Sequence, residues 1–312
     1  MPTWFAGVIG IPTVHNQVIA RALGCASYPE IMFGGNTLAV LNKHDPQTLK
    51  IGSSAIINIR STTNQGIYVF SDYDGGFDYS QNPLNIATDK VTTIGAAVQS
   101  HGGSFVSDPA TRTLLNVQDN VPLIKDTYPY PAVSCAADAQ EDPANPGHLF
   151  PGNFPGSHFS SGTVFPPFTD TFLYPGVYCL DSDIKMTGNV TLQGIKVSIY
   201  QRSGSITVNG GVFNLSANTD VNAPLRGLLI YLPVTNNSDV KFLGGGDVIM
   251  TGTIMAPSSV VNITGGSTTQ GTYQTQVVAD KIVIGGNGLI NLTYDADSQY
   301  QPPVSAVIQL LK

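Results

Sequence analysis

The residues from Ile184 to Tyr294 repeat a short module in which two runs of alternating apolar and polar residues flank a small, glycine-rich corner. Alternation with a period of two residues predicts β-strands. Glycine allows the chain to bend at each corner, because it tolerates backbone angles that are closed to other residues. The clearest copies are IKMTGNVTL from Ile184, ITVNGGVFNL from Ile206, VIMTGTIMA from Val248 and IVIGGNGLINL from Ile282, with LKIGSSAIINI from Leu49 as an earlier copy.

The copies recur at a nearly constant interval. Their starts at Ile184, Ile206, Leu228 (in the run LLIYL) and Val248 are separated by 22, 22 and 20 residues. A period of that size indicates stacked repeats, in which each turn of the chain buries its apolar side against its neighbours. The sequence therefore predicts an all-β fold, a β-solenoid in the form of a right-handed parallel β-helix with coils of about 20 residues.

The alternating pattern extends into the N-terminal part of the chain. TLAVLN, LKIGSSAIINI and GIYVF predict the first coils, and looser apolar runs as far as Val121 predict one or two more. Residues 1–36 are expected to form a separate N-terminal segment, with a short helix at Thr3–Gly10 and a strand at His15–Ala22. Residues 37–312 are predicted to be a single solenoid domain.

Between residues 122 and 175 prolines become frequent, so that little regular structure is expected and the segment is interpreted as a long insertion in the solenoid. It holds too many aromatic residues for a solvated linker, and we expect these to pack on a solenoid face or to cap one end. The C-terminal tail after Tyr294 is expected to close the last coil. The aromatic residues of the loop where surface specificity is expected are Tyr128, Tyr130, Phe150, Phe154 and Phe159.

Composition limits the classes of function. Hydrophobic residues make up 42% of the 312 residues, enough for a core, whereas charged residues make up only 11%, well below the roughly 25% of an ordinary domain. The net charge of −7 argues against nucleic-acid binding, because no cluster of Lys and Arg can neutralise phosphates. No run of about 18 apolar residues is available to span a bilayer. A signal peptide is also absent, so Met1 is treated as an uncertain natural start.

Three cysteines leave one over from any pairing. Cys135 lies in the Pro-rich segment and Cys179 at the entrance to the repeats, so a disulfide between them would pin the segment to the solenoid. Cys25, in ALGCASY, is interpreted as a small buried residue rather than a catalytic thiol.

Three aspartates in SDYDGGFDYS, Asp72, Asp74 and Asp78, surround a Gly-Gly turn and are the sharpest candidates for a metal site. Carboxylate oxygens at alternating positions suit Ca²⁺. The full EF-hand spacing is absent, and aspartates also form plain turns by hydrogen-bonding their own backbone. We adopt the plain turn, with calcium as the alternative and no other cofactor. Asp295 and Asp297 present the same choice.

A polysaccharide-active enzyme is the competing interpretation. Glycosidic chemistry needs two carboxylates about 5 to 10 Å apart across a groove, whereas the repeats carry few charges, of which Arg226, Lys241 and Asp247 are candidates to converge. Isolated charges at coil edges more often discourage edge pairing. The five histidines are dispersed, with only His148 and His158 sharing the Pro-rich segment, and no nucleophile-elbow or nucleotide-binding motif occurs in its required context. We therefore predict that the protein is not an enzyme.

Five asparagines begin Asn-X-Ser/Thr triplets. Glycosylation requires a cell that performs it, so we interpret these residues as structural, with side chains that hydrogen-bond between coils. On an exposed flat face the same side chains could contact sugars or ordered water. The five are Asn189, Asn214, Asn236, Asn262 and Asn291.

Several stretches resemble one known family. The opening PTWFAGVIGIPTVHNQVIARA is similar to the segment after the membrane helix in TadG-like proteins of the Tad/Flp pilus-assembly group. TLAVLN, LKIGSSAIINIRSTTNQGIYVFS, PGVYCL, KMTGNVTLQGIKVSIYQ, RGLLIYLP, MTGTIMAPSSVVNITGG and VVADKIVIGGNGLINLTYD resemble their extracellular C-terminal domain. The resemblance covers most of the chain. It implies a prokaryotic envelope protein, normally tethered by an N-terminal transmembrane helix and linked to pilus assembly or adhesion, with no catalytic residues to carry over. The tether is missing from this sequence.

These observations predict a non-enzymatic, extracellular structural or adhesive protein of the cell surface, associated with Tad-type pili or self-assembling into oligomers or filaments. The expected partner is a protein or glycan at the cell surface, and membrane contact is expected only through an anchor outside this sequence. The alternatives are a polysaccharide-active β-helix enzyme and a calcium- or glycan-binding module centred on Asp72, Asp74 and Asp78.

Overall fold

Strands make up nearly all of the regular structure in the computed structural model. It describes residues 31–43, 45, 47–52, 56–63, 65–70, 128–265 and 271–302, together with the backbone of short strands elsewhere. The described residues contain no α-helix and a single 3₁₀ turn, η1 (Met32–Gly35). The prediction of an all-β fold is confirmed.

The contacts divide the chain into two units, each described by itself. The smaller unit joins the two ends of the chain, Met1–Glu30 and Pro303–Lys312. In it, β1 (Arg21–Gly24) pairs antiparallel with β27 (Ile308–Leu311). The helix predicted at Thr3–Gly10 lies outside the described residues, as does most of the strand predicted at His15–Ala22.

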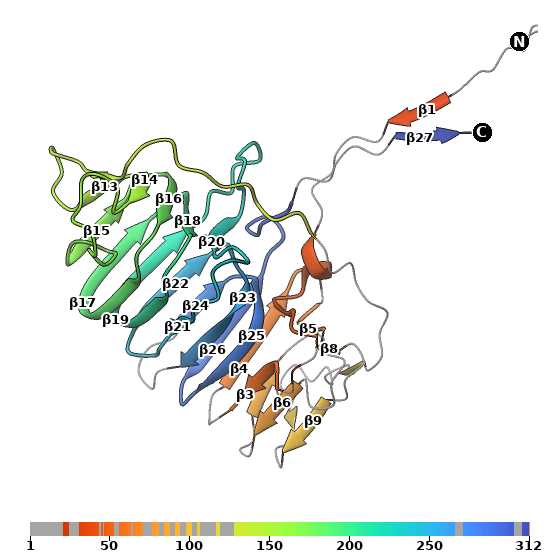
Figure 1. The fold of residues 1–312 in the computed structure, drawn as a ribbon. Coiled ribbons are helices and arrows are strands. Elements are labelled where there is room, and N and C mark those ends of the chain that lie inside the picture. The colour runs from red at the N-terminus through yellow and green to blue at the C-terminus, as the bar shows by residue number, and fades with distance from the viewer. Residues whose placement is uncertain are drawn as a thin grey trace, which may run out of the picture. The chain divides into compact units, whose positions relative to one another are not determined.

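The larger unit, residues 31–302, is built on a 25-stranded sheet. Its strands pair in parallel, apart from β12 (Gln140–Glu141), which pairs antiparallel with β13 (His148–Phe150). The parallel strands form three series, here named ladders 1, 2 and 3. The chain visits the ladders in rotation, so that a full turn, or coil, places one strand in each of them (Figure 1).

The strands are given in the order in which they lie along each ladder. Ladder 1 contains β13, β15 (Asp170–Leu173), the second halves of β17 (Ile184–Gly194) and β19 (Ile206–Ser216), β22 (Gly246–Thr251), β24 (Gly271–Gln274), β26 (Leu289–Tyr294), β4 (Ile56–Ser61), β7 (Leu84–Ala87) and β10 (Phe105–Val106). Ladder 2 contains β14 (Gly152–Phe154), β16 (Gly176–Leu180), β18 (Val197–Gln201), β20 (Leu228–Tyr231), the first parts of β23 (Thr253–Gly265) and β25 (Val277–Gly286), β2 (Leu38–Val40), β5 (Ile67–Val69), β8 (Val91–Thr93) and β11 (Val117–Gln118). Ladder 3 contains the first halves of β17 and β19, β21 (Val240–Phe242), the second parts of β23 and β25, β3 (Leu49–Ile51), β6 (Phe77–Ser80) and β9 (Val98–His101). Among the described strands, the coils at the two ends of the series, with β13 and β14 and with β10 and β11, have strands in ladders 1 and 2 alone.

The glycine-rich corners of β17 and β19 are the places where these long strands pass from ladder 3 to ladder 1. The corner in VIMTGTIMA differs, because its Gly252 lies between β22 of ladder 1 and β23, which begins in ladder 2. In β17 and β19 the two apolar arms of the predicted module therefore belong to different ladders. Gly211 shows why the corner needs glycine. Its φ is +73°, and a Cβ there would collide with the carbonyl oxygen of Val190, so any side chain would force the coils apart.

The interval of 22, 22 and 20 residues counted from the sequence mixes the three ladders. Ile184 and Ile206 begin strands of ladder 3, whereas Leu228 lies in ladder 2 and Val248 in ladder 1. Within ladder 3 the partner of Ile206 is Val240, because longer connections enlarge that one coil. The stacked coils are as expected, but their spacing is less regular than the count implied.

One inward row of ladder 3 shows how the coils are held together. Parallel register places each of its side chains directly over the corresponding one of the next coil, and all are 0% exposed. Such a column removes apolar surface from water at every step, which is the main stabilising contribution in a stack of repeats. The row consists of Ile184, Ile206, Val240, Val261, Ile282 and Leu49.

The order of the coils differs from the order of the sequence. The predicted first coils, which contain β2 and β3, do not lie at one end but pair with β25, and β4 pairs with β26. One coil, here named the seam coil, is therefore made of β26, from near the C-terminus, and of β2 and β3, from near the N-terminus. The chain enters and leaves the stack at this coil.

Two further expectations are corrected. The Pro-rich segment is not simply an irregular insertion, because β13, β14 and β15 within it pair in the ladders and build the first coils of the stack. The C-terminal tail does not close the last coil. Strand β2 of the seam coil instead pairs with β25, and β4 of the next coil pairs with β26. The tail strand β27 pairs with β1 in the smaller unit.

Candidate functional site

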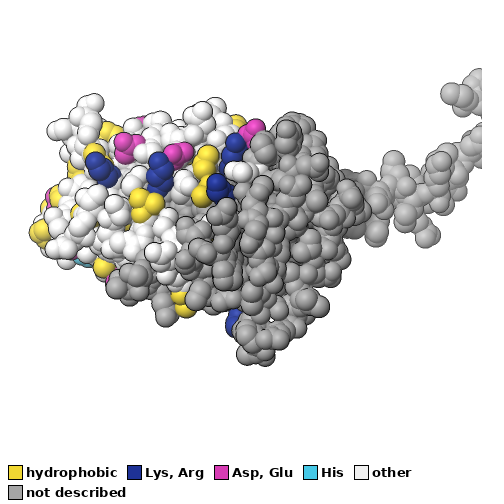
Figure 2. All heavy atoms as spheres, turned by 90° about the horizontal axis from the view of Figure 1, so that it is seen from below, with side chains coloured by type: hydrophobic (Ala, Val, Ile, Leu, Met, Phe, Trp, Pro, Cys, Tyr) yellow, Lys and Arg dark blue, Asp and Glu magenta, His cyan; other side chains and the backbone are white. Residues whose placement is uncertain are grey.

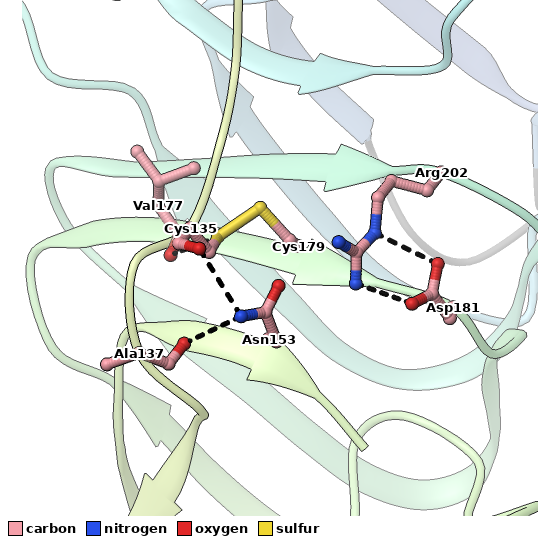
Figure 3. The surroundings of a disulfide bond; sticks show 7 residues. All are labelled: Cys135, Ala137, Asn153, Val177, Cys179, Asp181 and Arg202. Atoms are coloured by element: carbon pink, nitrogen blue, oxygen red, sulfur yellow. Dashed lines mark hydrogen bonds and ion pairs between the residues drawn. A yellow bond between two sulfur atoms is a disulfide. The ribbon is translucent and has the colours of Figure 1, made fainter. Parts of the chain in front are cut away.

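A disulfide joins Cys135 to Cys179 of β16, with an S–S distance of 2.11 Å, as the sequence predicted (Figure 3). Asn153 of β14 stands beside it. The Asn153 Nδ2 donates hydrogen bonds to the carbonyl oxygens of Cys135, at 3.4 Å, and Ala137, at 3.0 Å. The backbone of Asn153 also exchanges hydrogen bonds with Ala137 and Ala139. Residues 135–139 are thus fastened to the first coils by covalent and polar contacts.

The outward row of ladder 2 is apolar and aromatic. Register aligns its side chains one per coil, and the rings of Tyr200 and Tyr231 stack 5.3 Å apart. Tyr231 is 4% exposed, and this burial raises its pKa to about 12. The row consists of Cys179, Tyr200, Tyr231, Met255, Val278, Ala39 and Tyr68.

Part of the Pro-rich segment covers this row. We name residues 128–138 the crossing segment, which in Figure 1 runs from the coils of β14 and β16 towards η1. At one end the Tyr128 hydroxyl accepts a hydrogen bond from the Phe33 backbone N–H, at 2.9 Å, and at the other end is the disulfide. Tyr128 and Val133 pack against the same buried cluster as the row, and so do residues of the entering and leaving chain.

The crossing segment contains two prolines. Pro129 and Pro131 favour an extended backbone, because proline fixes φ and disfavours helix in the residue before it. Tyr128 and Tyr130 reach the row at Met255 and Val278, whereas Cys135 is bonded to Cys179. The prolines therefore suit an extended connection along the stack.

The entering and leaving ends of the larger unit meet at one corner. Gln276, which is 0% exposed, donates from Nε2 to the carbonyl oxygens of Met32 and Asn36 in the entering chain, at 3.2 and 2.9 Å. Its backbone N–H donates to Gln299 Oε1 in the leaving chain, at 3.0 Å. The Gln299 Nε2 in turn donates to the carbonyl oxygen of Gln274. A short polar network thus ties both ends to the turn between β24 and β25.

A shallow hollow of about 290 Å³ lies on the outer side of ladder 1, near the first coils. Its lining combines aromatic, hydroxyl, amide and carboxylate side chains with the turn before β13. The lining residues are Pro146, Gly147, His148, Asp170, Thr171, Phe172, Thr191 and Gln193.

The turn beside the hollow is held by Asp142. Its carboxylate accepts hydrogen bonds from Asn145 Nδ2 and the Tyr174 hydroxyl, both at 2.7 Å, and from the Ala144 backbone N–H at 2.9 Å. These donors stabilise the ionised carboxylate and lower the pKa of Asp142 to about 2. The same turn places His148 against Phe172, with ring centroids 4.8 Å apart.

Several exposed charges on the coils form ion pairs with one another. In Figure 2, basic and acidic side chains lie close together on the face that is shown. Pairs of this kind contribute only about 0 to 1 kcal/mol each, so they do not dominate stability. The pairs are Lys196–Asp220, Arg202–Asp181, Lys241–Asp239 and Lys281–Asp45.

The three residues considered for a catalytic cluster do not come together. Arg226 precedes ladder 2 and contacts Asp297, with its Nη2 donating to the Asp297 carbonyl oxygen at 2.9 Å. Lys241 is in ladder 3 and Asp247 in ladder 1. Asp295, the other aspartate weighed for a metal, caps a turn by accepting from the Asp297 N–H and from Gln274 Nε2.

The calcium prediction lies almost entirely outside the described residues. Asp72 and Asp74 are not described, and of Asp78 only the backbone is, in β6 opposite Lys50. In the part of the chain that is described, no three His, Cys, Asp or Glu side chains are grouped so that they could hold a metal ion.

The predicted loop aromatics fall into two groups. Tyr130 and Phe150 are exposed, and Tyr128 and Phe159 are half-buried. Phe154 was wrongly placed on the surface, since it is 0% exposed and packs between Phe159 and Phe165 in the core. Of the Asn-X-Ser/Thr residues, Asn236 is buried and bridges coils by donating to the carbonyl oxygens of Gln201 and Gly204.

The sequence reasoning missed the hollow on ladder 1 and the corner at Gln276. The clue to the hollow was the alternation in TFLYP and VTLQG, which turns Phe172 and Gln193 outward. The corner left no local signal, because Gln276 contacts Gln299, 23 residues away, and Met32, 244 residues away.

Comparison with known proteins gave no further guidance. No protein-family model, no curated protein and no solved structure matches the chain. Within the described residues, the structure has no helix with the length and apolar character required to cross a membrane.

Proposed function

We propose that the protein is a non-enzymatic, extracellular structural or adhesive protein that displays its stack of coils from a single stem at a prokaryotic cell surface. One observation carries this proposal. Gln276 holds both the entering chain, at Met32 and Asn36, and the leaving chain, at Gln299. Because both ends leave the stack at the same coil, a tether at either terminus leaves both ends of the stack available for contact.

Other features of the molecule support the same proposal. The Cys135–Cys179 disulfide is of a kind that persists in oxidising compartments such as the cell exterior. Several exposed charges of the coils form ion pairs, as expected of a scaffold. The resemblance to TadG-like proteins belongs to this proposal, with association with Tad-type pili as its most specific form.

The proposal includes the finer description of the fold. The rotation of the chain through three parallel ladders is the connectivity of a parallel β-helix. We infer that it is right-handed, because crossover connections between parallel strands are right-handed in about 98% of cases. An experimental structure with left-handed coils would contradict this.

The test is adhesion of beads that carry the protein by its N-terminus. We expect such beads to adhere to cells, to isolated pili or to immobilised glycans more than beads carrying an unrelated protein. A second set of beads would carry the protein through a cysteine introduced at Val221, which is 79% exposed, to show whether the point of tethering matters. Failure of both sets on all three surfaces would overturn the adhesive function.

Self-assembly is tested separately by light scattering with size-exclusion chromatography. Oligomers that grow with concentration are expected if the ends of the stack associate. A monomer at all concentrations would remove self-assembly and leave adhesion standing.

A further inference from the structure

The outer side of ladder 1 presents one side chain per coil in a straight row. Register places His148 opposite Phe172, Phe172 opposite Gln193, and Gln193 opposite Asn214. Gln193 and Asn214 are exposed, and Phe172 and His148 are half-buried. Since neighbouring strands are ~4.8 Å apart, the row offers two aromatic rings followed by two amides at that repeat.

The hollow occupies the start of this row and has polar groups on both sides. The Thr191 hydroxyl and the Asp170 carboxylate line it beside Phe172 and Gln193. The Pro146–Gly147 turn forms part of its wall and cannot easily be altered, because a Cβ on Gly147 would lie 2.6 Å from the Asp170 carbonyl oxygen. The site is therefore built from rigid strands and one tightly hydrogen-bonded turn.

One polar atom at the hollow has no partner. The Nδ1 of His148 is buried and makes no hydrogen bond to any residue that the structure describes. Buried polar atoms are nearly always hydrogen-bonded, and an exception calls for an explanation. The imidazole also lies against Phe172, with the ring planes tilted by 35°, and 5.4 Å from the ring of Tyr174, so its orientation is fixed by packing.

The chemistry of the hollow selects a class of ligand. Aromatic faces suit the apolar C–H face of a sugar ring, while amide, hydroxyl and carboxylate groups pair with sugar hydroxyls. The lining contains the Asp170 carboxylate and neither Lys nor Arg, so an anionic sugar would be repelled. The regular repeat along the row favours a linear chain over a single sugar.

We propose that His148, Phe172, Gln193 and Asn214, with the hollow beside them, bind a linear neutral glycan that runs across the coils. Phe172 and His148 contact the C–H face of one sugar unit, and Gln193 and Asn214 hydrogen-bond the hydroxyls of the units that follow. This rests on the proposed adhesive function and names its ligand class.

The experiment is calorimetric titration of the full chain with three hexasaccharides: cellohexaose, chitohexaose and the anionic hexagalacturonate. At least one neutral hexasaccharide is expected to bind, with an affinity at least tenfold above that of hexagalacturonate. Gln193→Ala is expected to weaken binding about fivefold, the loss of roughly one neutral hydrogen bond. Phe172→Leu is expected to weaken it by more, because the ring face is removed.

The matched control is Asn209→Ala, which removes an exposed amide of β19 on ladder 3 and is expected to leave binding unchanged. Each variant's melting temperature is measured first, and Gln193→Ala, at an exposed position, keeps the test valid if Phe172→Leu does not fold. No binding of either neutral hexasaccharide at millimolar concentration would overturn the proposal. Equal losses in Gln193→Ala and Asn209→Ala, or tighter binding of hexagalacturonate, would do the same.

The bead assay separates this failure from failure of the proposed function. Adhesion of the beads without hexasaccharide binding would remove the glycan site and leave adhesion standing. Hexasaccharide binding without adhesion would leave the site standing and remove the adhesive function.

Discussion

Ladders 1 and 2 belong to the same coils and bury the same kind of inward row, yet their outer sides differ. The outward row of ladder 2 is apolar, with Tyr231, Met255 and Val278 no more than 4% exposed, and the chain covers it with the crossing segment. The corresponding row of ladder 1 turns the amides of Gln193 and Asn214 to the solvent. The covered side contributes to stability, and the open side is available for recognition.

The largest effect is expected at the disulfide, which fastens the cover to ladder 2. Replacing Cys135 and Cys179 by serine releases a link between residues 44 positions apart, and the chain-entropy relation gives a loss of about 4 kcal/mol in unfolding free energy. Denaturant unfolding of the wild type and the double variant measures it. The double variant should be insensitive to reducing agent, and a loss below about 1 kcal/mol would show that the crossing segment is held without the disulfide.

A matched pair of alanine variants compares the two outer sides directly. Tyr231→Ala removes a nearly buried ring beneath the crossing segment and is expected to lower the unfolding free energy by about 3 kcal/mol. Asn214→Ala, on the open side, is expected to change stability by less than about 0.5 kcal/mol. Both changes in unfolding free energy are measured from the midpoints of urea denaturation. Similar losses in the two variants would contradict the division into a covered and an open side.

The next largest change in unfolding free energy is expected at the corner formed by Gln276. Gln276→Met keeps the length of the side chain but removes the donors to Met32 and Asn36, leaving two buried carbonyl oxygens unpaired at a cost of about 2 kcal/mol. Gln193→Met, at an exposed position, is the control and should be nearly neutral. Hydrogen exchange at residues 32–36 should also speed up in Gln276→Met. Unchanged exchange would show that the entering chain is held by other contacts.

The sequence predicted local features well because the signals are local. Alternating residues such as Ile184, Met186 and Ile206, Val208 indicate which side chains face inward, and all four are buried. The pairing of Cys135 with Cys179 followed from their places at the two ends of one connection. Glycine at the corners predicted the bends but not which ladder each arm joins.

The order of the coils could not be predicted from the same signals. A period of two residues indicates which side of a strand is buried. Among the residues that the structure describes, however, the inward rows are mostly apolar in every coil, so the pattern does not indicate which coil follows β26. That Tyr294 lies opposite Ser61, and Ile282 opposite Leu49, is a choice between similar surfaces. The hollow on ladder 1 was missed for a related reason, since His148, Phe172 and Gln193 are adjacent only across coils.

The smallest effect concerns the turn that borders the open side. The pKa of Asp142 is about 2 in the folded protein, below the value of about 3.9 expected for an unfolded chain. Its hydrogen bonds therefore stabilise the turn fully above pH 4 and are lost as the pH falls towards 2. The Ala144 N–H donates to Asp142, so its protection factor against hydrogen exchange should fall in that window. The protection factor of the Tyr231 amide, on the covered side, should not change.

Asp142→Asn is the control for this pH dependence, because an amide does not titrate in the same range. Its protection factor at Ala144, which is the exchange rate corrected for the intrinsic pH dependence, should be lower than in the wild type at pH 5 and nearly independent of pH between 5 and 2. The carboxyl carbon resonance of Asp142 gives the pKa directly, with a midpoint near 2 expected. A midpoint near 3.9 would mean that Asn145 and Tyr174 do not hold the carboxylate in solution, and that the wall of the hollow on the open side is looser than its hydrogen bonds indicate.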